Sequence, residues 1–118
     1  MMDTAFVKIV LTIKKIVELL VLKRYIELEQ LTGGVRLNAT EIEQAIYDYD
    51  GVLVMPPDGD FENNVDAIEI TESSPKSWSV RYDLWTEEEG RSDLSLEVTL
   101  IDGGNELMRV ELDNIHVL

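Results

Sequence analysis

The sequence predicts an α+β fold in which N-terminal helices pack on a curved, antiparallel four-stranded β-meander. In the first fifty residues, apolar side chains recur at the spacing of a helix face. In the second half, apolar and polar residues alternate strictly over residues 78–85, 93–101 and 107–113, which gives each strand one apolar face. The 118 residues suffice for one domain. We expect a single domain over residues 1–118, with helices in about 3–50 and the sheet in about 65–118.

The first predicted helix covers about residues 3–23, and Asp3 or Thr4 can cap its free amides. Its apolar face consists of Phe6, Ile9, Val10, Ile13, Ile16, Val17 and Leu20. Many of these residues are β-branched, so packing rather than intrinsic propensity must stabilise the helix. Val7, Leu11, Val21 and Leu22 widen the apolar surface. We therefore expect this helix to be buried on two sides or partly covered by a second subunit.

Two shorter helices follow. The pattern predicts one over residues 24–32, ended by Gly33 and Gly34. The next has a capping box, with Asn38 as the N-cap and Glu41 three residues later, and we expect Gly51 to end it. Residues 52–55 are typical of a short extended segment, and residues 58–64 of a polar turn.

Four strands complete the predicted fold: one near residues 65–71 and three in the alternating segments. Turn sequences at residues 73–76, 87–92 and 102–105 separate them. In the last strand the apolar phase runs through Val110 and Leu112 and then switches to Ile115 and Val117. A shift of one residue indicates a β-bulge, which we place at residues 113–114.

The formal net charge is −14, and residues 37–118 contain twenty acidic and only four basic residues. Binding to nucleic acid or to an anionic membrane is disfavoured, because both need Lys and Arg. A basic protein partner is favoured instead. The chain has no cysteine, which excludes disulfides and thiolate metal sites and is compatible with a cytoplasmic protein, as we expect here. Residues 5–22 are interrupted by four charged residues, so we expect no membrane span.

The order of elements resembles the cone-shaped fold of the nuclear transport factor two-like superfamily, also called SnoaL-like or cystatin-like α+β. The segments that carry the resemblance are residues 25–29, the helix over 38–49 and the closing strand over 110–117. Members commonly have a small hairpin between the second and third helices; here only residues 35–37 are available, so that element is missing or rebuilt. The superfamily includes isomerases, dehydratases, hydrolases, ligand binders, dimerisation modules and immunity proteins. The resemblance therefore implies a region of interest between sheet and helices, but no single activity.

The predicted interior offers little for catalysis. The side chains expected to point inward are apolar except for Tyr82, and His116 is the only histidine, which excludes a two-histidine metal site. Isomerase-type members of the superfamily use an aspartate base with a tyrosine, so the resemblance implies an alternative site in which Tyr82 acts with Asp48 or Asp50. Asp58, Asp60, Glu62 and Glu69 follow part of a calcium-loop count, but Asn63 stands where glycine is required. We expect a solvated turn there, and neither a metal nor another cofactor.

A binding surface is predicted on the outer face of the sheet. Trp85 is out of phase with the buried residues and shares a strand face with Arg81 and Asp83, while Glu87, Glu88 and Glu89 form the adjacent turn. Aromatic and arginine side chains are enriched at protein interfaces. The alternative is that Trp85 packs under the 87–92 loop.

These observations lead to two hypotheses. The first is a non-enzymatic module that binds a protein, like an immunity or antitoxin protein that masks a basic site, or a dimerisation domain; we expect a homodimer through the sheet face or the first helix. The second is a small-molecule binder, or a lyase or isomerase, with a pocket between sheet and helices. An apolar interior and an acidic surface favour the first.

Overall fold

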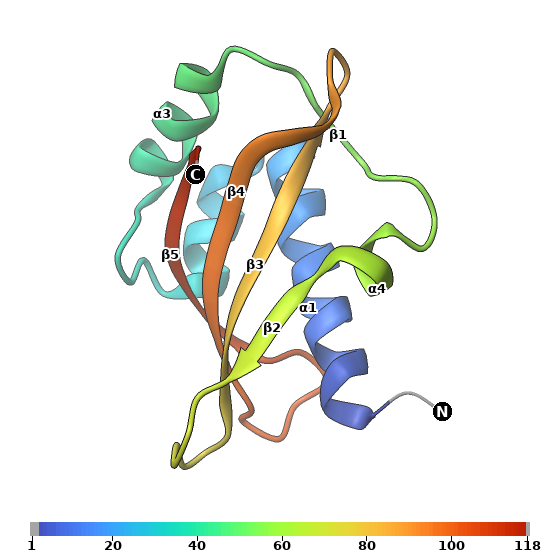
Figure 1. The fold of residues 1–118 in the computed structure, drawn as a ribbon. Helices are drawn as coiled ribbons and strands as arrows, with labels where there is room; N and C mark the ends of the chain where they lie inside the picture. Colours follow the sequence, from blue (N-terminus) through green and yellow to red (C-terminus); the bar gives the residue numbers. More distant parts are fainter. Residues whose placement is uncertain (1–2, 118) are drawn as a thin grey trace.

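The computed structural model describes residues 3–117 and has an α+β fold, as the sequence predicts: helices cover the concave face of a curled antiparallel sheet (Figure 1). The elements in chain order are α1 (Thr4–Val21), α2 (Tyr25–Thr32), α3 (Ala39–Tyr49), β1 (Leu53–Val54), α4 (Asp60–Asn64), β2 (Asp66–Glu69), β3 (Ser77–Thr86), β4 (Gly90–Ile101) and β5 (Arg109–Val117). No helix within residues 3–117 has the length and apolar character needed to cross a membrane.

The sheet is a meander, β2-β3-β4-β5, with β1 added beside β2 on the same edge of β3. Glu97 pairs with Asn114 and Val98 with Leu112, so Asp113 is an extra residue in β5. The predicted bulge at 113–114 is confirmed. A second irregularity lies where β3 pairs with β4 between Asp83 and Trp85, and there Ser92 Oγ donates to the Leu84 carbonyl at 2.6 Å. Bulges bend strands, and β4 turns sharply near this end of the sheet (Figure 1).

The core lies between α1 and the concave face of the sheet. The inward residues of β3, β4 and β5 alternate as predicted, and the side chains that they and α1 contribute are almost entirely apolar. The largest fully buried side chains are Tyr82, Ile13, Ile16, Leu20, Leu28, Ile42, Leu84, Leu96, Leu100, Leu112, Val17 and Val80. Each large aliphatic side chain buried here contributes about 1.5–3 kcal/mol of transfer free energy. This packing stabilises α1 despite its β-branched composition.

The predicted helix ends are confirmed except one. Asp3 caps α1, and the capping box is complete: Glu41 N donates to Asn38 Oδ1 at 2.9 Å and Asn38 N donates to Glu41 Oε1 at 3.0 Å. Gly33 ends α2 in the left-handed conformation. The prediction that Gly51 ends α3 is wrong, because Asp50 takes the left-handed C-cap position with a φ of 58°. Aspartate tolerates that conformation better than most residues.

The segment predicted as a polar turn, residues 58–64, contains the short helix α4, which the sequence pattern did not predict. Phe61 is buried and its ring stacks on that of Tyr82, with centroids 5.0 Å apart. Gly59 precedes the helix with a φ of 86°, a conformation that favours glycine. The following strand is accordingly shorter than predicted and begins at Asp66. Leu118, at the end of the predicted sheet region, lies outside the described residues.

Candidate functional site

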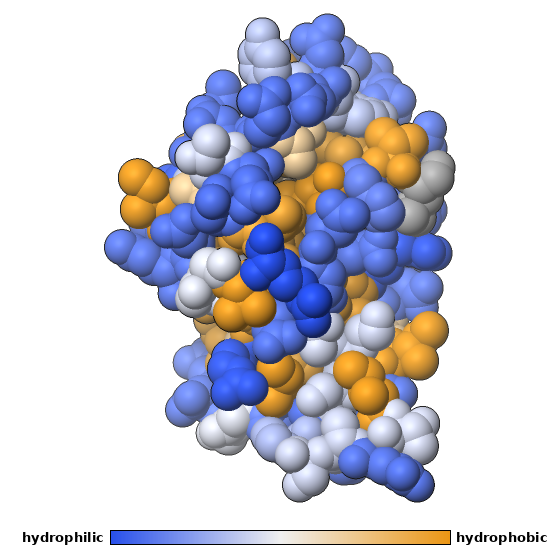
Figure 2. Space-filling model, turned by 90° about the vertical axis from the view of Figure 1, so that its left-hand side faces the viewer, coloured by the Kyte–Doolittle hydropathy of each residue, from blue (hydrophilic) through white to orange (hydrophobic). Residues whose placement is uncertain are grey.

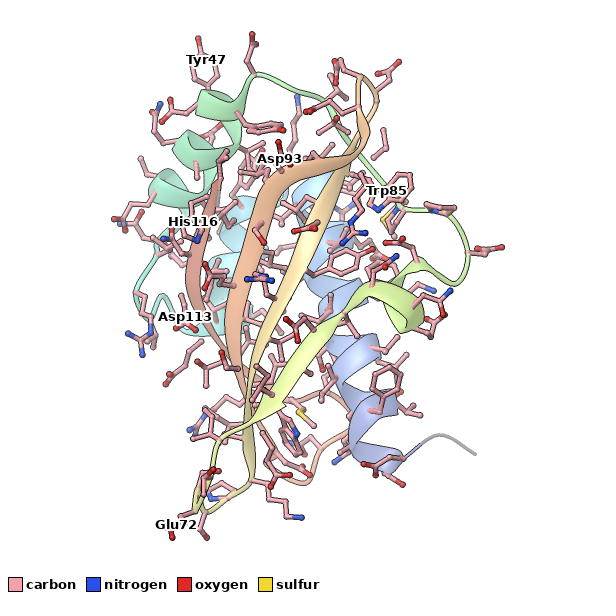
Figure 3. The ribbon with its side chains drawn as sticks, viewed as in Figure 1. Tyr47, Glu72, Trp85, Asp93, Asp113 and His116 are labelled. Carbon is pink, nitrogen blue, oxygen red and sulfur yellow. The ribbon has the colours of Figure 1, made fainter. Side chains whose placement is uncertain are left out.

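The candidate site is a surface that we call the acidic end. α3 and the β3–β4 turn lie at the same end of the molecule (Figure 1), and both are rich in carboxylates. The acidic end consists of Glu43, Asp48, Asp50, Glu87, Glu88, Glu89 and Asp93. These side chains come from segments that are about forty residues apart in the sequence. Figure 3 shows Tyr47 and Asp93 at this end and Glu72 at the opposite one.

Hydrogen bonds fix the β3–β4 turn against the end of α3. Tyr49 Oη donates to Glu89 Oε1 at 2.6 Å, and the backbone N–H of Val52 donates to Glu88 Oε1 at 3.1 Å. The Glu87 N–H donates to the Val52 carbonyl at 2.8 Å. These contacts join the β3–β4 turn to the end of α3, so that the carboxylates of both segments lie at one end of the molecule.

Apolar side chains are exposed within this acidic surface. A groove of about 280 Å³ is lined by Lys23, Tyr25, Glu43, Ile46, Tyr47, Asp50, Gly51, Val52 and Glu88. Tyr47 is 77% exposed and Val52 51% exposed, although both are large and apolar enough to favour burial. The groove therefore combines two uncovered apolar side chains with three carboxylates and one lysine.

Two tyrosines beside the acidic end have raised pKa values, to which both burial and neighbouring carboxylates contribute. Burial, and then the nearby charge of Glu43, raises the pKa of Tyr25 above its usual value. The hydrogen bond to Glu89, followed by burial, raises the pKa of Tyr49. Negative charge opposes formation of a tyrosinate, which is why neighbouring carboxylates act in this direction.

The predicted binding residues lie along β3 and in the turn that follows it. Glu87, Glu88 and Glu89 belong to the acidic end. Arg81 and Asp83 face outward on β3, but each pairs with a neighbour within the sheet: Arg81 lies 3.7 Å from Asp66, and Arg91 lies 3.0 Å from Asp83.

Trp85 is half-buried, and its side chain contacts other parts of the fold. Its indole Nε1 donates to Asp60 Oδ2 at 2.9 Å. A Cβ atom on Gly90, at the end of the β3–β4 turn, would lie 3.5 Å from the Trp85 ring. The indole therefore contacts α4 through its N–H and lies beside the β3–β4 turn with its ring.

Asp60 is the centre of a buried polar cluster. Its carboxylate accepts hydrogen bonds from Tyr82 Oη, Trp85 Nε1 and Asn64 Nδ2. Tyr82 is only 1% exposed, and burial, followed by the hydrogen bond to Asp60, raises the pKa of its hydroxyl well above the usual value. The three donors satisfy both carboxylate oxygens. The cluster therefore joins α4 to β3.

The structure does not pair Tyr82 with the carboxylates of the alternative catalytic site. Tyr82 hydrogen-bonds to Asp60 and to neither Asp48 nor Asp50. Asp48 and Asp50 are exposed, and Asp48 accepts from Gln44 at 2.7 Å. No feature of the apolar periodicity indicated Asp60, but Phe61 was an apolar residue in an otherwise polar turn and could have suggested that this segment packs inward.

The predicted metal alternative is also dispersed. Asp60 points inward to its three donors, whereas Asp58 and Glu69 are exposed on either side of it. Within residues 3–117, no three carboxylate or histidine side chains come together in an arrangement suited to a metal ion. His116 lies on β5 in contact with Glu97 of β4.

Comparison with known proteins gives a family but no described activity. Neither a curated protein nor a solved structure matches the chain. Residues 17–118 match the family described as a domain of unknown function, DUF7668. This match covers the end of α1 from Val17 onward, α2, α3, α4 and the whole sheet. The chain belongs to the DUF7668 family.

Proposed function

We propose that this chain is a non-enzymatic protein-binding domain whose acidic end docks on a basic surface of its partner, as an immunity or antitoxin protein does. Its fold is proposed to be a variant of the nuclear transport factor two-like superfamily that lacks the hairpin between α2 and α3. The observation that carries the proposal is the pair of exposed apolar residues, Tyr47 and Val52, in a groove rimmed by carboxylates from two segments.

This arrangement has the composition of a binding hot spot. Affinity at interfaces concentrates in a few central side chains, with Tyr over-represented, surrounded by polar residues that exclude water when the complex forms. Tyr47 and Val52 supply the apolar centre, and Glu43, Asp50 and Glu88 supply the rim. A complementary surface would present Lys or Arg around an apolar recess.

The charge distribution supports a basic partner. Lys8, Arg24, Arg36, Arg81 and Arg91 are each within 4 Å of a carboxylate of the chain itself. The carboxylates of the acidic end have a single lysine, Lys23, in their groove. An unneutralised acidic surface attracts a basic protein over a Debye length of about 8 Å at physiological salt and speeds its association.

A binding role is supported over catalysis because the buried polar side chains of Asp60 and Tyr82 are already hydrogen-bonded to each other. Both oxygens of Asp60 are occupied by donors, and the Tyr82 hydroxyl is engaged with the same carboxylate. Neither residue lines any of the five surface grooves described for residues 3–117. Asp60 and Tyr82 are 7% and 1% exposed, so neither side chain is open to a substrate from solvent.

The test compares capture of partners from a native extract by three forms of the chain. The acidic-end variant carries Glu43→Gln, Asp50→Asn and Glu87→Gln; these side chains are exposed, and asparagine tolerates the left-handed backbone of Asp50. The control variant removes three negative charges elsewhere, at Glu69, Glu72 and Glu106, all exposed. Since Glu72 lies at the end opposite to Tyr47 (Figure 3), the control matches net charge but not position.

We expect the unmodified chain and the control to retain the same basic protein at low salt and to lose it at high salt. The acidic-end variant should not retain it at either salt concentration, and Tyr47→Ala should weaken retention without changing the charge. Equal capture by the control and the acidic-end variant would contradict the proposal, because total charge rather than this surface would then select the partner.

Self-association is part of the proposal. The α1 surface is the better candidate of the two predicted faces, because it exposes Val7 and Leu11, one turn apart and each 39% exposed. The outer face of the sheet instead presents the ion pairs of Arg81 and Arg91. Sedimentation equilibrium should give a dimer that Leu11→Glu dissociates; a monomer at all concentrations would remove this part of the proposal.

A further inference from the structure

The outer edge of β5 is an open sheet edge. β5 stands last in the sheet and pairs only with β4. Within residues 3–117, no backbone hydrogen bond joins it to any other segment. β2 also has an open side but is four residues long, against nine for β5. A long open edge presents unpaired backbone N–H and C=O groups and can accept an added strand.

Two grooves border this edge, one near each end of the strand. A groove of about 410 Å³ is lined by Leu31, Val35 and Val110, among others, and reaches β5 at residues 109–111. A second groove of about 290 Å³ is lined by Ala45, Ile115 and Val117, among others, and reaches β5 at residues 115–117. The side of the molecule that bears β5 and α3 shows apolar patches between polar side chains (Figure 2). A strand added to β5 could place alternate side chains in these grooves.

Arg36 lies across the edge between the two grooves. It belongs to the α2–α3 connection, on the helix side of the sheet, and has a left-handed backbone with a φ of 71°, which is uncommon for a non-glycine residue. Its Nε is 2.5 Å from Asp113 Oδ1, and its Nη2 is 3.7 Å from Glu111 Oε1. Glu111 and Asp113 flank the buried Leu112 and face away from the core, so Arg36 reaches around the strand edge to contact them.

We propose that the edge of β5 binds an extended basic segment of a partner protein as an added strand, and that a Lys or Arg of this segment replaces Arg36 beside Glu111 and Asp113. The inference deepens the proposed function, on which it rests for the basic character of the partner. Charge complementarity selects this occupant. A second copy of the chain would bring its own Glu111 and Asp113 to the same edge, and like charges on neighbouring strands are destabilising.

The probe is a nine-residue peptide of alternating Lys and Val, added to the full chain. A peptide with Glu in place of Lys tests charge, and the Lys peptide with N-methylated backbone amides tests strand pairing. Binding is followed by the chemical shifts and hydrogen exchange of the backbone amides. We expect the Lys peptide to protect amides of residues 109–117, and neither matched peptide to do so.

Arg36→Ala should raise the affinity for the Lys peptide by about threefold to fivefold, the effect of removing one competing surface ion pair. Arg36→Gly also removes the side chain and suits the left-handed backbone, so it replaces the alanine variant if that variant does not fold. Arg81→Ala makes the same change of charge at an exposed arginine paired with Asp66, away from β5. It should change the affinity by less than about twofold.

Three results would overturn the edge site. In the first, the peptide protects only the acidic end, which would leave the proposed function intact. In the second, the Lys peptide binds neither the unmodified chain nor a folded Arg36 variant. In the third, protection of residues 109–117 rises with protein concentration without peptide, which would identify a second copy as the occupant. Conversely, protection of β5 with failure of the acidic-end capture experiment would contradict the proposed function alone.

Discussion

Replacing Asp60 with alanine should destabilise the fold strongly, although the residue lies in a short helix that the sequence presents as a polar turn. The carboxylate accepts from Tyr82, Trp85 and Asn64. Asn64 is half-buried and can turn to water, but Tyr82 is 1% exposed and its hydroxyl has no solvent to replace the lost acceptor. A hydrogen bond to a charged group contributes about 1.5–3 kcal/mol.

Losing the bonds from Tyr82 and Trp85 thus costs about 3–6 kcal/mol, and relief from burying a carboxylate offsets part of this. We expect Asp60→Ala to lower the free energy of unfolding by about 2–4 kcal/mol, a large share of the roughly 5–15 kcal/mol typical of a domain. Tyr82→Phe should cost about 1.5–3 kcal/mol. The double variant should cost less than the sum of the two, because both remove the same bond.

Urea unfolding followed by tryptophan fluorescence and by circular dichroism measures these free energies. Asp58→Ala is the matched control: it removes a carboxylate two residues away that is exposed, and it should change the free energy by no more than about 0.5 kcal/mol. If Asp60→Ala behaved like Asp58→Ala, or if the costs of Asp60→Ala and Tyr82→Phe were additive, the buried cluster would not be what holds α4 on β3.

Three further predictions concern stability. Because the pKa of Tyr82 is raised in the folded state, an unfolded tyrosine ionises first; the free energy of unfolding should be undiminished below about pH 10 and should fall above it by up to about 1.4 kcal/mol per pH unit. Tyr82→Phe should reduce that slope in urea unfolding at pH 9–11, and an unchanged slope would contradict the assignment. Asn38→Ala removes the capping box of α3 and should cost about 1 kcal/mol in the same assay, whereas Thr40→Ala, an exposed neighbour, should cost clearly less. Gly33→Ala forces alanine to a φ of 71° and should lower the free energy of unfolding by about 1 kcal/mol. Gly103→Ala is the control, because a Cβ there would meet no atom within 4 Å, and it should leave the free energy of unfolding unchanged. Equal effects of the two variants would contradict the role of Gly33 as the C-cap of α2.

Much of the fold could be predicted because its main signals are local. Strict alternation in β3, β4 and β5 defined the buried face of the sheet, and the phase switch after Leu112 predicted the bulge that Asp113 forms. Asn38 and Glu41 predicted the start of α3 from a spacing of three residues. Each of these features depends on residues that are neighbours in the sequence.

The errors arose where distant contacts decide the local structure. α4 is too short to show a helical period, and it is stabilised by the stacking of Phe61 on Tyr82 and the hydrogen bonds of Asp60 to residues more than twenty positions away. The same cluster engages the Trp85 indole, which donates to Asp60, a contact that alternation along β3 could not indicate. The alternative site placed Tyr82 with Asp48 or Asp50, but the tyrosine hydroxyl donates to Asp60 of α4.

The acidic end could be predicted only in part. The run from Glu87 to Glu89 was recognised from the sequence, but its contact with α3 depends on hydrogen bonds to Tyr49 and Val52 across the fold. Tyr47 could have been recognised from the sequence, because it falls outside the apolar stripe formed by Ile42, Ile46 and Tyr49. A large aromatic residue off the buried face of a helix is a candidate for binding.

The most direct test of the central claim is the association rate of the captured partner with the purified chain as a function of ionic strength. If the acidic end steers a basic partner, the rate should fall steeply between low and high salt, and the variant at Glu43, Asp50 and Glu87 should start lower and depend less on salt. The control at Glu69, Glu72 and Glu106 should follow the unmodified chain. A rate that is independent of salt, or is reduced equally in both variants, would contradict the claim that this surface recognises the partner.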